Sequence, residues 1–296
     1  MKVLEHGGAR VAALHDAKTG SWQYVVSDRA TGAAGVIDPV WDFDEKAAAT
    51  STRNADALLA YIAEADLKVE WILDTHPHAD HFSAGPYLKE KLGAPTAIGE
   101  KVRGVQSLWR GIYSLGDELP VDGRQWDRLF AEGDTFNVGT LPGRVMFSPG
   151  HTMASITYLI GGCAFVHDTL MMPDAGTSRA DFPGGDSRAL YRSIQAILAL
   201  PDQTGVFVGH DYAPNGREPA FFSTVGEQKA ANSHLRGGVS EADFTALRDK
   251  RDATLPLPRL MLYALQVNIR GGRLPPPDED GRSFLRVPVN YFAAPS

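Results

Sequence analysis

The chain has 296 residues, of which 43% are hydrophobic and 22% are charged, as expected for one large globular domain or one domain with an appended lobe. Its 36 acidic residues outnumber its 29 basic residues and give a net charge of −7, which argues against a nucleic-acid-binding surface. The sequence contains no apolar run of about 20 residues and does not begin with a signal-peptide pattern. We therefore expect no membrane partner and a cytoplasmic location.

Short apolar runs bounded by turn residues predict β-strands through the first two thirds of the chain. These runs are 10–16, 21–28, 33–39, 69–75, 144–150, 155–162, 163–168 and 205–211. Helical periodicity predicts helices over 54–67, 86–92 and 187–200, and Asp186 or Ser187 is the expected N-cap of the last. The mixture of elements predicts an α/β fold. The single cysteine, Cys163, lies in an expected strand, where a buried and unreactive thiol is the simplest interpretation.

Two longer regions bear on domain organisation. A change of composition near residue 231 predicts a main domain over residues 1–230 and an extension over residues 231–296 that packs on it. The segment 107–130 has more aromatic residues than a connector needs. Two interpretations of it are open, a lid over a pocket and a contact in a homodimer.

The stretch DTHPHADH, residues 74–81, places three histidines and two aspartates within eight positions of a chain that has nine histidines in total. It follows the expected strand 69–75. In an extended segment His76 and His78 point to the same side because side chains alternate, and Asp80 and His81 follow in the turn toward the next helix. Imidazole and carboxylate groups are ligands for zinc, iron and manganese. This stretch therefore predicts a metal site.

Matching groups stand at the ends of three other expected strands: His151 in SPGHT, Asp168 in VHDT and His210 in VGHDY. Loops that leave one edge of a rigid sheet scaffold commonly build one site. The full predicted constellation has seven members. They are His76, His78, Asp80, His81, His151, Asp168 and His210.

The pattern HxHxDH, followed by a distant histidine, an aspartate and a last histidine, resembles that of the metallo-beta-lactamase fold superfamily, and all its positions are filled. The resemblance implies an αββα sandwich with the metal site at one edge between the two sheets. For a two-metal member it implies that Asp168 bridges the metals. The first metal would be held by His76, His78 and His151, and the second by Asp80, His81 and His210.

The stretches 169–194, 208–212 and 265–281 are similar to the persulfide dioxygenase branch, which is related to glyoxalase II. That resemblance implies one Fe(II) per chain on His76, His151 and Asp168, and a glutathione persulfide that is oxidised to sulfite. Two histidines and one carboxylate are also the ligand set of non-heme iron oxygenases. The alternative use of the same residues is a glyoxalase II-like hydrolase with two Zn(II) ions, which would cleave thioesters or other esters and lactones.

Candidate residues for catalysis and substrate binding follow from the same resemblance. We assign catalytic roles to Asp80 and Tyr212, and substrate binding to Arg179, Tyr212 and Arg270, because arginine suits the carboxylates of a glutathione-linked substrate and a phenol can hydrogen-bond a persulfide. The structural alternatives are a salt bridge from Arg179 to Asp181, a core position for Tyr212 and a surface loop for Arg270.

Three sites depart from the family pattern. Ala180 stands where close relatives often have cysteine, and Met153 and Ala154 stand where the branch usually has a Pro-Gly or Pro-Ala pair. His167 stands beside Asp168, where relatives usually have glycine. It either points away from the metal site and is inert, or it perturbs the site.

Overall fold

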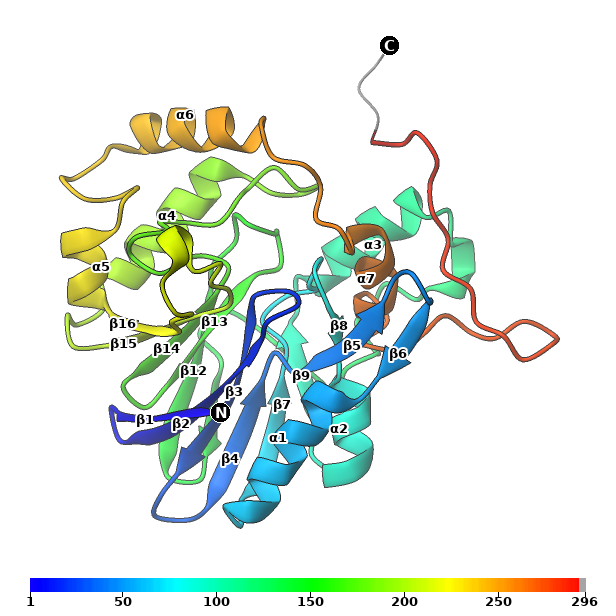
Figure 1. Cartoon of the computed structure of the whole chain (residues 1–296), viewed down its shortest axis with the longest axis horizontal. Helices are drawn as coiled ribbons and strands as arrows, with labels where there is room; N and C mark the ends of the chain where they lie inside the picture. Colours follow the sequence, from blue (N-terminus) through cyan, green and yellow to red (C-terminus); the bar gives the residue numbers. More distant parts are fainter. Residues whose placement is uncertain (293–296) are drawn as a thin grey trace.

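The computed structural model describes residues 1–292, in which two large β-sheets face each other (Figure 1). The first has the strand order β1-β2-β3-β4-β7-β9-β10 and the second the order β11-β12-β13-β14-β15-β16. The strands of the first sheet are β1 (Lys2–His6), β2 (Ala9–Asp16), β3 (Ser21–Asp28), β4 (Ala33–Ile37), β7 (Lys68–Leu73), β9 (Thr96–Gly99) and β10 (Arg128–Phe130). Those of the second are β11 (Thr135–Val138), β12 (Leu141–Phe147), β13 (Ile156–Ile160), β14 (Cys163–His167), β15 (Gly205–Val208) and β16 (Phe222–Thr224). A small third sheet consists of β6 (Ala49–Ser51), β5 (Val40–Asp44) and β8 (Phe82–Ser83).

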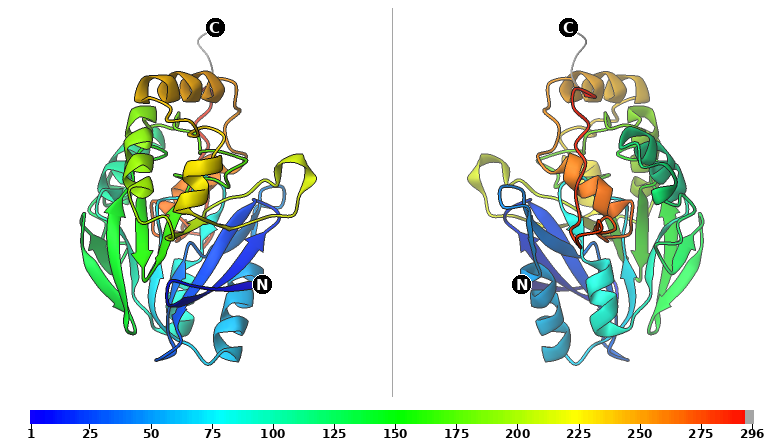
Figure 2. Two further views of the ribbon diagram at one scale, coloured as in Figure 1. Left: turned by 90° about the vertical axis from the view of Figure 1, so that its left-hand side faces the viewer. Right: turned by 90° about the vertical axis from the view of Figure 1, so that its right-hand side faces the viewer.

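Helices cover the outer faces of both sheets (Figure 2). The seven α-helices of residues 1–292 are α1 (Arg53–Glu64), α2 (Gly85–Leu92), α3 (Val102–Ile112), α4 (Ser187–Leu198), α5 (Val225–Ala231), α6 (Glu241–Asp252) and α7 (Met261–Asn268). Leu58 of α1 and Leu88 of α2 pack on Val36 and Ile72 of the first sheet. Leu190 and other apolar residues of α4 belong to the core of the second sheet. The αββα sandwich expected from the sequence is confirmed.

The main hydrophobic core lies between the two sheets. It joins Val26 and Leu73 of the first sheet to Val145 and Phe165 of the second, all of them buried. Tyr24 crosses this interface and donates from its hydroxyl to the carbonyl oxygen of Val208 at 2.6 Å. Burial of this many apolar side chains is the main force that holds the two sheets together. It fixes the ends of their strands relative to one another.

All eight strands and all three helices expected from the sequence are present, with shifted ends. The N-cap of α4 is Asp186, whose side chain accepts from the backbone N–H of Ala189 at 2.8 Å. The helix expected over 54–67 ends at Glu64, because Asp66 adopts a positive φ of 50° that an α-helix does not allow. Cys163 is buried, and burial raises the pKa of its thiol to about 12, which agrees with an inert role.

The C-terminal part of the chain packs against the sandwich. Helix α6 lies on α4, and α7 lies beside the loop that follows β7 (Figure 1). A boundary between residues 230 and 231 would fall one residue before the end of α5, and the division into a main domain and an extension stays a prediction. No helix within residues 1–292 combines the length and the hydropathy that crossing a membrane requires.

Candidate metal centre

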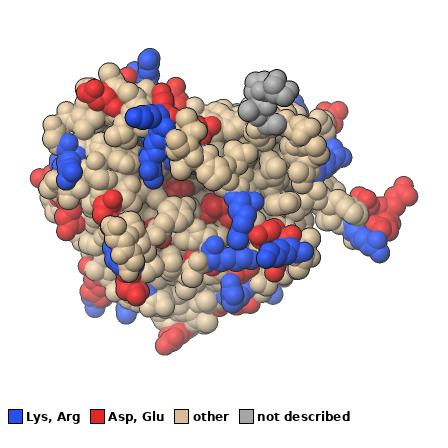
Figure 3. Space-filling model, turned by 45° about the horizontal axis from the view of Figure 1, so that its top comes forward, with Lys and Arg blue, Asp and Glu red and all other residues tan. Residues whose placement is uncertain are grey.

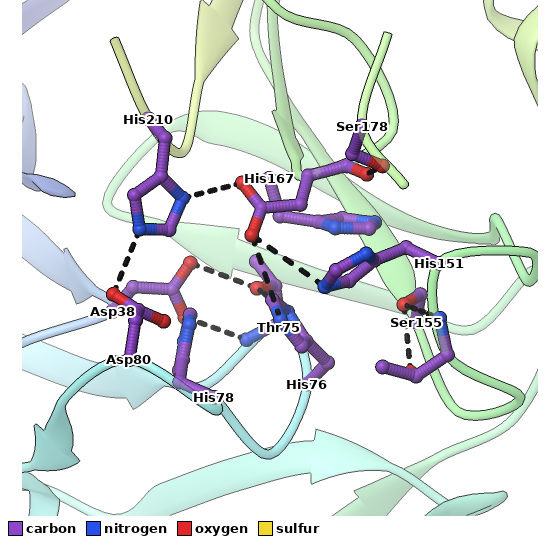
Figure 4. A network of polar contacts seen from close by, with 12 residues as sticks. Asp38, Thr75, His76, His78, Asp80, His151, Ser155, His167, Ser178 and His210 are labelled. Carbon is purple, nitrogen blue, oxygen red and sulfur yellow. Dashed lines mark hydrogen bonds and ion pairs between the residues drawn. The ribbon is translucent and has the colours of Figure 1, made fainter. Parts of the chain in front are cut away.

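The seven predicted residues meet at one edge of the sandwich. Residues 74–81 connect β7 to β8, and the other three loops follow β12, β14 and β15 (Figure 4). A β-bulge between Phe165 and His167 and a positive φ of 41° at His167 turn the end of β14, and Oδ1 of the following Asp168 lies 2.5 Å from Nδ1 of His210. Gly209 makes the close approach of β15 possible, because a Cβ there would lie 2.8 Å from Oδ1 of Asp168.

Three of the seven side chains form a compact triad: His76, His151 and Asp168. One ligand atom from each lies within 4.8 Å of the other two. Oδ2 of Asp168 is 3.6 Å from Nε2 of His151 and 4.0 Å from Nε2 of His76. These distances are too long for hydrogen bonds, but they suit donor atoms that surround one ion. All three residues are buried, and so is Nε2 of His76, which has no hydrogen-bond partner within residues 1–292.

The orientation of His76 is set by its neighbour. The hydroxyl of Thr75 donates to Oδ2 of Asp38 at 2.8 Å, and Oγ1 of Thr75 lies 3.0 Å from Nδ1 of His76. Because the single hydroxyl hydrogen is already used, Thr75 accepts from Nδ1–H of His76. The lone pair of Nε2 then faces the triad. This is the usual arrangement of a metal-binding histidine, whose second nitrogen is held by a protein group.

His151 is oriented in the same manner by a backbone group. Its Nδ1 lies 2.8 Å from the carbonyl oxygen of Arg179, which can only accept, so Nδ1 carries the proton and Nε2 is free to bind a metal. Burial lowers the pKa of both His76 and His151, which favours the neutral rings that metal binding requires. Burial by itself raises the pKa of Asp168, but the charge and hydrogen bond of His210 bring it below the usual value. The donor set therefore fits one divalent metal ion.

The remaining four residues have protein partners. His78 places Nε2 3.0 Å from Oδ1 of Asp38 in an ion pair, although neither of its ring nitrogens has a hydrogen-bond partner within residues 1–292. His210 lies between two carboxylates, with Nδ1 2.5 Å from Asp168 and Nε2 2.8 Å from Asp80. The hydroxyl of Ser21 also donates to Asp80, at 2.8 Å. His210 thus uses both ring nitrogens within the protein, and Asp80 is held from two sides.

A second group of ligand atoms comes from His78, Asp80 and His81, and one atom of each lies within 4.8 Å of the others. His81 directs Nδ1 to the carbonyl oxygen of Phe82 at 3.1 Å, which leaves its Nε2 available. His210, which the two-metal pattern would add to this group, does not belong to it. The predicted seven residues therefore come together as a triad, a neighbouring group of three and a histidine between carboxylates.

His167 is buried beneath the triad. Its Nε2 lies 3.1 Å from the hydroxyl of Ser148 and 2.9 Å from that of Thr169, and its ring centroid is 5.0 Å from that of His76. Burial lowers the pKa of His167 to about 3, so the ring is neutral at physiological pH. The ring of His167 does not point away from the site, as the inert interpretation expected, but packs behind His76; the interpretation that it perturbs the site stays a prediction.

A cavity of about 760 Å³ opens onto the site, and Asp80, His151, Asp168 and His210 lie at one end of it. Tyr212 lines it with its ring parallel to that of His210, at a centroid distance of 5.8 Å, and is 66% exposed, so it is no core aromatic. Basic, apolar and neutral polar residues form the rest of the wall, together with the acidic Asp174. They include Arg179, His234, Arg248, Arg251, Leu255, Pro256, Leu257, Pro258 and Arg259.

The two arginines predicted to bind substrate differ in their surroundings. Arg179 lines the cavity but also forms the salt bridge to Asp181 at 2.6 Å, so both interpretations of this residue describe part of its environment. For Arg270 the structure differs from the predicted position at the substrate. This residue is buried at the end of α7, pairs with Glu118 and donates to the carbonyl oxygen of Gln266 at 2.8 Å, and it lies neither in a surface loop nor in the cavity wall.

The aromatic segment 107–130 supports α7. Trp109 and Tyr113 pack with Met261 and Leu265 of that helix, and none of the residues 107–130 lines the cavity. Trp109 does line a small separate pocket together with His151, so the lid and the homodimer contact both stay predictions.

Sequence analysis missed three buried residues that hold the site: Ser21, Asp38 and Asn268. Asp38 ends the strand run AAGVID, in the same way as Asp74 ends VEWILD, and that repeated pattern was a usable signal. No sequence pattern pointed to Ser21 or Asn268. Asn268, at the end of α7, donates to the backbone of the loop that contains His78 and His81.

Comparison with known proteins gives a consistent result. The profile of the metallo-beta-lactamase superfamily matches residues 18–210. The "Beta-lactamase hydrolase-like protein" of Xylella fastidiosa is 63% identical over 281 residues, which are 95% of this chain and 65% of the relative. The chain therefore spans just under two thirds of that relative's length. "Glyoxylase B2" of Dictyostelium discoideum is 42% identical over 96% of this chain and 98% of its own.

Two further matches carry the name ETHE1. "Persulfide dioxygenase ETHE1, mitochondrial" of Bos taurus is 26% identical over 93% of this chain and 95% of its own. The crystal structure of ETHE1 from Myxococcus xanthus superposes with a TM-score of 0.70 at 30% identity, and covers 89% of this chain and 99% of that one.

Proposed function

Because this chain belongs to the metallo-beta-lactamase superfamily, we propose that it is a metalloenzyme with one Fe(II) on His76, His151 and Asp168 that oxidises glutathione persulfide. The persulfide dioxygenase name of the ETHE1 relatives supports this choice. The net reaction consumes one O2 and one water for each persulfide. The outer sulfur leaves as sulfite with three oxygen atoms, and glutathione is released together with two protons.

The proposal rests on one observation: the seven predicted residues separate into a triad and four residues that lie outside it. The triad has donor atoms that face one point, whereas both ring nitrogens of His210 lie on carboxylates and Nε2 of His78 lies on Asp38. Two histidines and one carboxylate occupy one face of an ion and leave adjacent positions open for a substrate and O2. A bound ferrous ion supplies the redox chemistry by which O2 oxidises the sulfur.

The chain's own residues bind and orient the substrate and move its protons. Tyr212 presents its phenol at the cavity beside His210, where it can donate to a persulfide sulfur. Asp80 lines the same end of the cavity without belonging to the triad, and it is placed to accept a proton that the reaction releases. The hydrogen bonds of Ser21 and His210 keep its carboxylate in that position.

The cavity supports a substrate larger than sulfide that carries negative charge. Its volume of about 760 Å³ lies within the range of small-molecule sites. Lys and Arg side chains lie around the hollow in the face shown in Figure 3. Among the arginines of the wall, Arg179 pairs with Asp181, Arg248 with Asp252 and Arg259 with Glu45.

Arg251 differs from these three. It is exposed, lines the cavity, and has no carboxylate partner within residues 1–292. We propose that Arg251, rather than Arg270, binds a carboxylate of the glutathione part, because a charged hydrogen bond between guanidinium and carboxylate is strong and geometrically specific.

The experiment is elemental analysis of protein from iron-supplemented cells, combined with oxygen uptake after addition of glutathione persulfide. About one iron per chain and rapid uptake are expected. The matched control is Asp168→Asn, which keeps the shape of the side chain and removes its charge. A protein that takes up no oxygen although it contains iron would contradict the dioxygenase proposal.

The second candidate is a hydrolase with two zinc ions, and the group His78, Asp80 and His81 beside the triad favours it. Zinc ions held by these residues would lower the pKa of a bound water to about 7 and so supply a nucleophile at neutral pH. The names of the Xylella and Dictyostelium relatives agree with such a reaction. Two zinc ions per chain, no oxygen uptake and hydrolysis of a glutathione thioester would establish this candidate and reject the first.

A further inference from the structure

Asn268 connects the C-terminal helix α7 to the loop of predicted metal ligands. Its side-chain Nδ2 donates to the carbonyl oxygens of His78 and His81, each at 2.7 Å, and its Oδ1 accepts from the backbone N–H of Ser83 at 2.8 Å. Only 2% of the residue is exposed. One amide thus meets three backbone groups of a loop that lies about 190 positions earlier in the chain.

The loop needs such a partner because it lies outside the sheets. Strand β7 ends at Leu73 and β8 begins at Phe82. The N–H of Asp74 still donates to Ala97 and the carbonyl oxygen of Thr75 still accepts from Ile156, but residues 76–81 take no part in a strand ladder. Buried carbonyl groups without partners cost free energy. The amide of Asn268 supplies two donors and one acceptor from a single planar group. Neither aspartate nor an apolar residue of the same shape can make the same three bonds.

Asn268 is itself held in place on both sides. Leu265 and Ile269 pack with α3, and Val267 packs with Phe82 at the end of the loop. The chain after α7 then passes so close to the loop that a Cβ at Gly272 would lie 2.4 Å from the carbonyl oxygen of Ser83. The end of α7 and the loop therefore form one tightly packed unit, in which the amide cannot move independently.

We propose that Asn268 is a positioning residue of the metal centre. It fixes the path of the backbone from His78 to Ser83, and this path sets the directions of Asp80 and His81 beside the triad. The inference requires only that the site binds a metal. With two zincs Asp80 and His81 are themselves ligands, and with one iron they lie beside it while His76, which binds it, belongs to the same loop. The role of Asn268 also gives the segment after residue 231 a direct part in building the site.

The test measures binding of metal alone, without turnover. Apoprotein of the whole chain is titrated anaerobically with Zn2+ and with Fe2+ in competition with a chelator, for the wild type and Asn268→Leu. Loss of a residue that orients metal ligands is expected to weaken metal binding by about 10- to 100-fold. The d–d spectrum of the Co2+-loaded protein is recorded as well, because a displaced ligand alters the spectrum.

The matched control is Asn232→Leu. Asn232 is also a buried amide with three bonds, to the carbonyl of Gly176, the side chain of Gln228 and the N–H of His234, and it does not touch the loop. A loss of affinity in Asn268→Leu that is at least tenfold greater than in Asn232→Leu supports the proposal. Equal affinities, or equal losses in both variants, overturn it.

If Asn268→Leu does not fold, the metal affinities of Asn268→Ser and Asn232→Ser are compared by the same criterion. The far-ultraviolet circular dichroism spectrum is the test of folding. Failure of the dioxygenase proposal would leave this result intact, because oxygen uptake does not enter the measurement. Conversely, an active dioxygenase whose metal affinity is unchanged by Asn268→Leu would reject the positioning role alone.

Discussion

The carbonyl oxygen of Arg179 accepts a hydrogen bond from Nδ1 of His151 at 2.8 Å, so the backbone of a predicted substrate-binding residue orients a predicted metal ligand. The side chain of Arg179 points elsewhere, to Asp181 and to the carbonyl oxygen of Pro256 at 2.7 Å. The two halves of this residue therefore have separable effects. Its carbonyl orients His151, and its guanidinium holds the loop that forms part of the cavity wall.

We expect Arg179→Gln to keep the metal content of the wild type, because every residue retains its backbone carbonyl. The loop at Pro256 loses its anchor, so KM for the persulfide should rise severalfold. Metal analysis and steady-state kinetics check both parts. His151→Ala is the control that loses metal, and a similar loss of metal in Arg179→Gln would disprove the separation.

Asp168→Ala should abolish metal binding and activity together. It removes the only carboxylate of the triad and also leaves the buried Nδ1 of His210 without its partner. Isothermal titration with Fe2+ or Zn2+ measures the binding. Asp174→Ala is the control, because Asp174 lines the cavity but pairs with Arg217 on the surface. An Asp168→Ala protein that retains metal would show that the triad is assigned wrongly.

His210→Ala distinguishes one metal from two. With a single iron on the triad, the metal content should stay near one per chain, while activity falls by about 10-fold because Asp168 and Asp80 lose a hydrogen-bond partner. With two metals held as the family pattern implies, where His210 binds the second ion, the content should drop by one ion per chain. Metal content relative to protein concentration, measured for the variant and the wild type from the same growth medium, decides between them.

Arg251→Gln should raise KM for glutathione persulfide about tenfold and leave kcat unchanged, which corresponds to a loss of about 1.4 kcal/mol of binding. The expected reason is loss of one charged contact with a substrate carboxylate far from the reacting sulfur. Arg236→Gln is the control, since Arg236 is also exposed but does not line the cavity. Equal kinetic constants in the two variants would show that Arg251 does not bind the substrate.

His234 should make the folded protein less stable at mildly acidic pH. Burial lowers the pKa of His234 to about 4, and its Nδ1 lies 3.1 Å from the backbone N–H of Thr177. Above pH 6.5 the ring is neutral in both the folded and the unfolded chain. Between pH 6.5 and 4 the unfolded chain binds a proton that the folded ring does not, so the free energy of unfolding falls as the pH falls.

The measurement is urea unfolding of the wild type and His234→Gln at pH 7.5 and pH 5. Between pH 7.5 and pH 5 the free energy of unfolding of the wild type should fall by on the order of 1 kcal/mol more than that of the variant. This figure is reduced because the ring is partly exposed. Parallel losses in the two proteins would mean that His234 is not the source of the pH dependence.

The sequence determined what depends on local spacing. Alternating and helical apolar patterns predicted the strands and helices that build the sandwich, because each pattern reflects which face of an element is buried. The run from His76 to His81 predicted a metal site, because neighbouring positions in a short loop must lie near one another. His151, Asp168 and His210 were predicted as well, because each follows an apolar run that ends in a turn.

Only the tertiary structure decided how the seven residues are divided and which other residues hold them. His78 pairs with Asp38, and Asp168 and Asp80 hold His210 between them. Arg270, predicted at the substrate, is buried against Glu118, whereas Arg251 lines the cavity. Asn268 reaches the loop from 187 and 190 positions away. Such contacts have no local pattern, because they are set by the packing of whole helices and sheets and not by the spacing of residues along the chain.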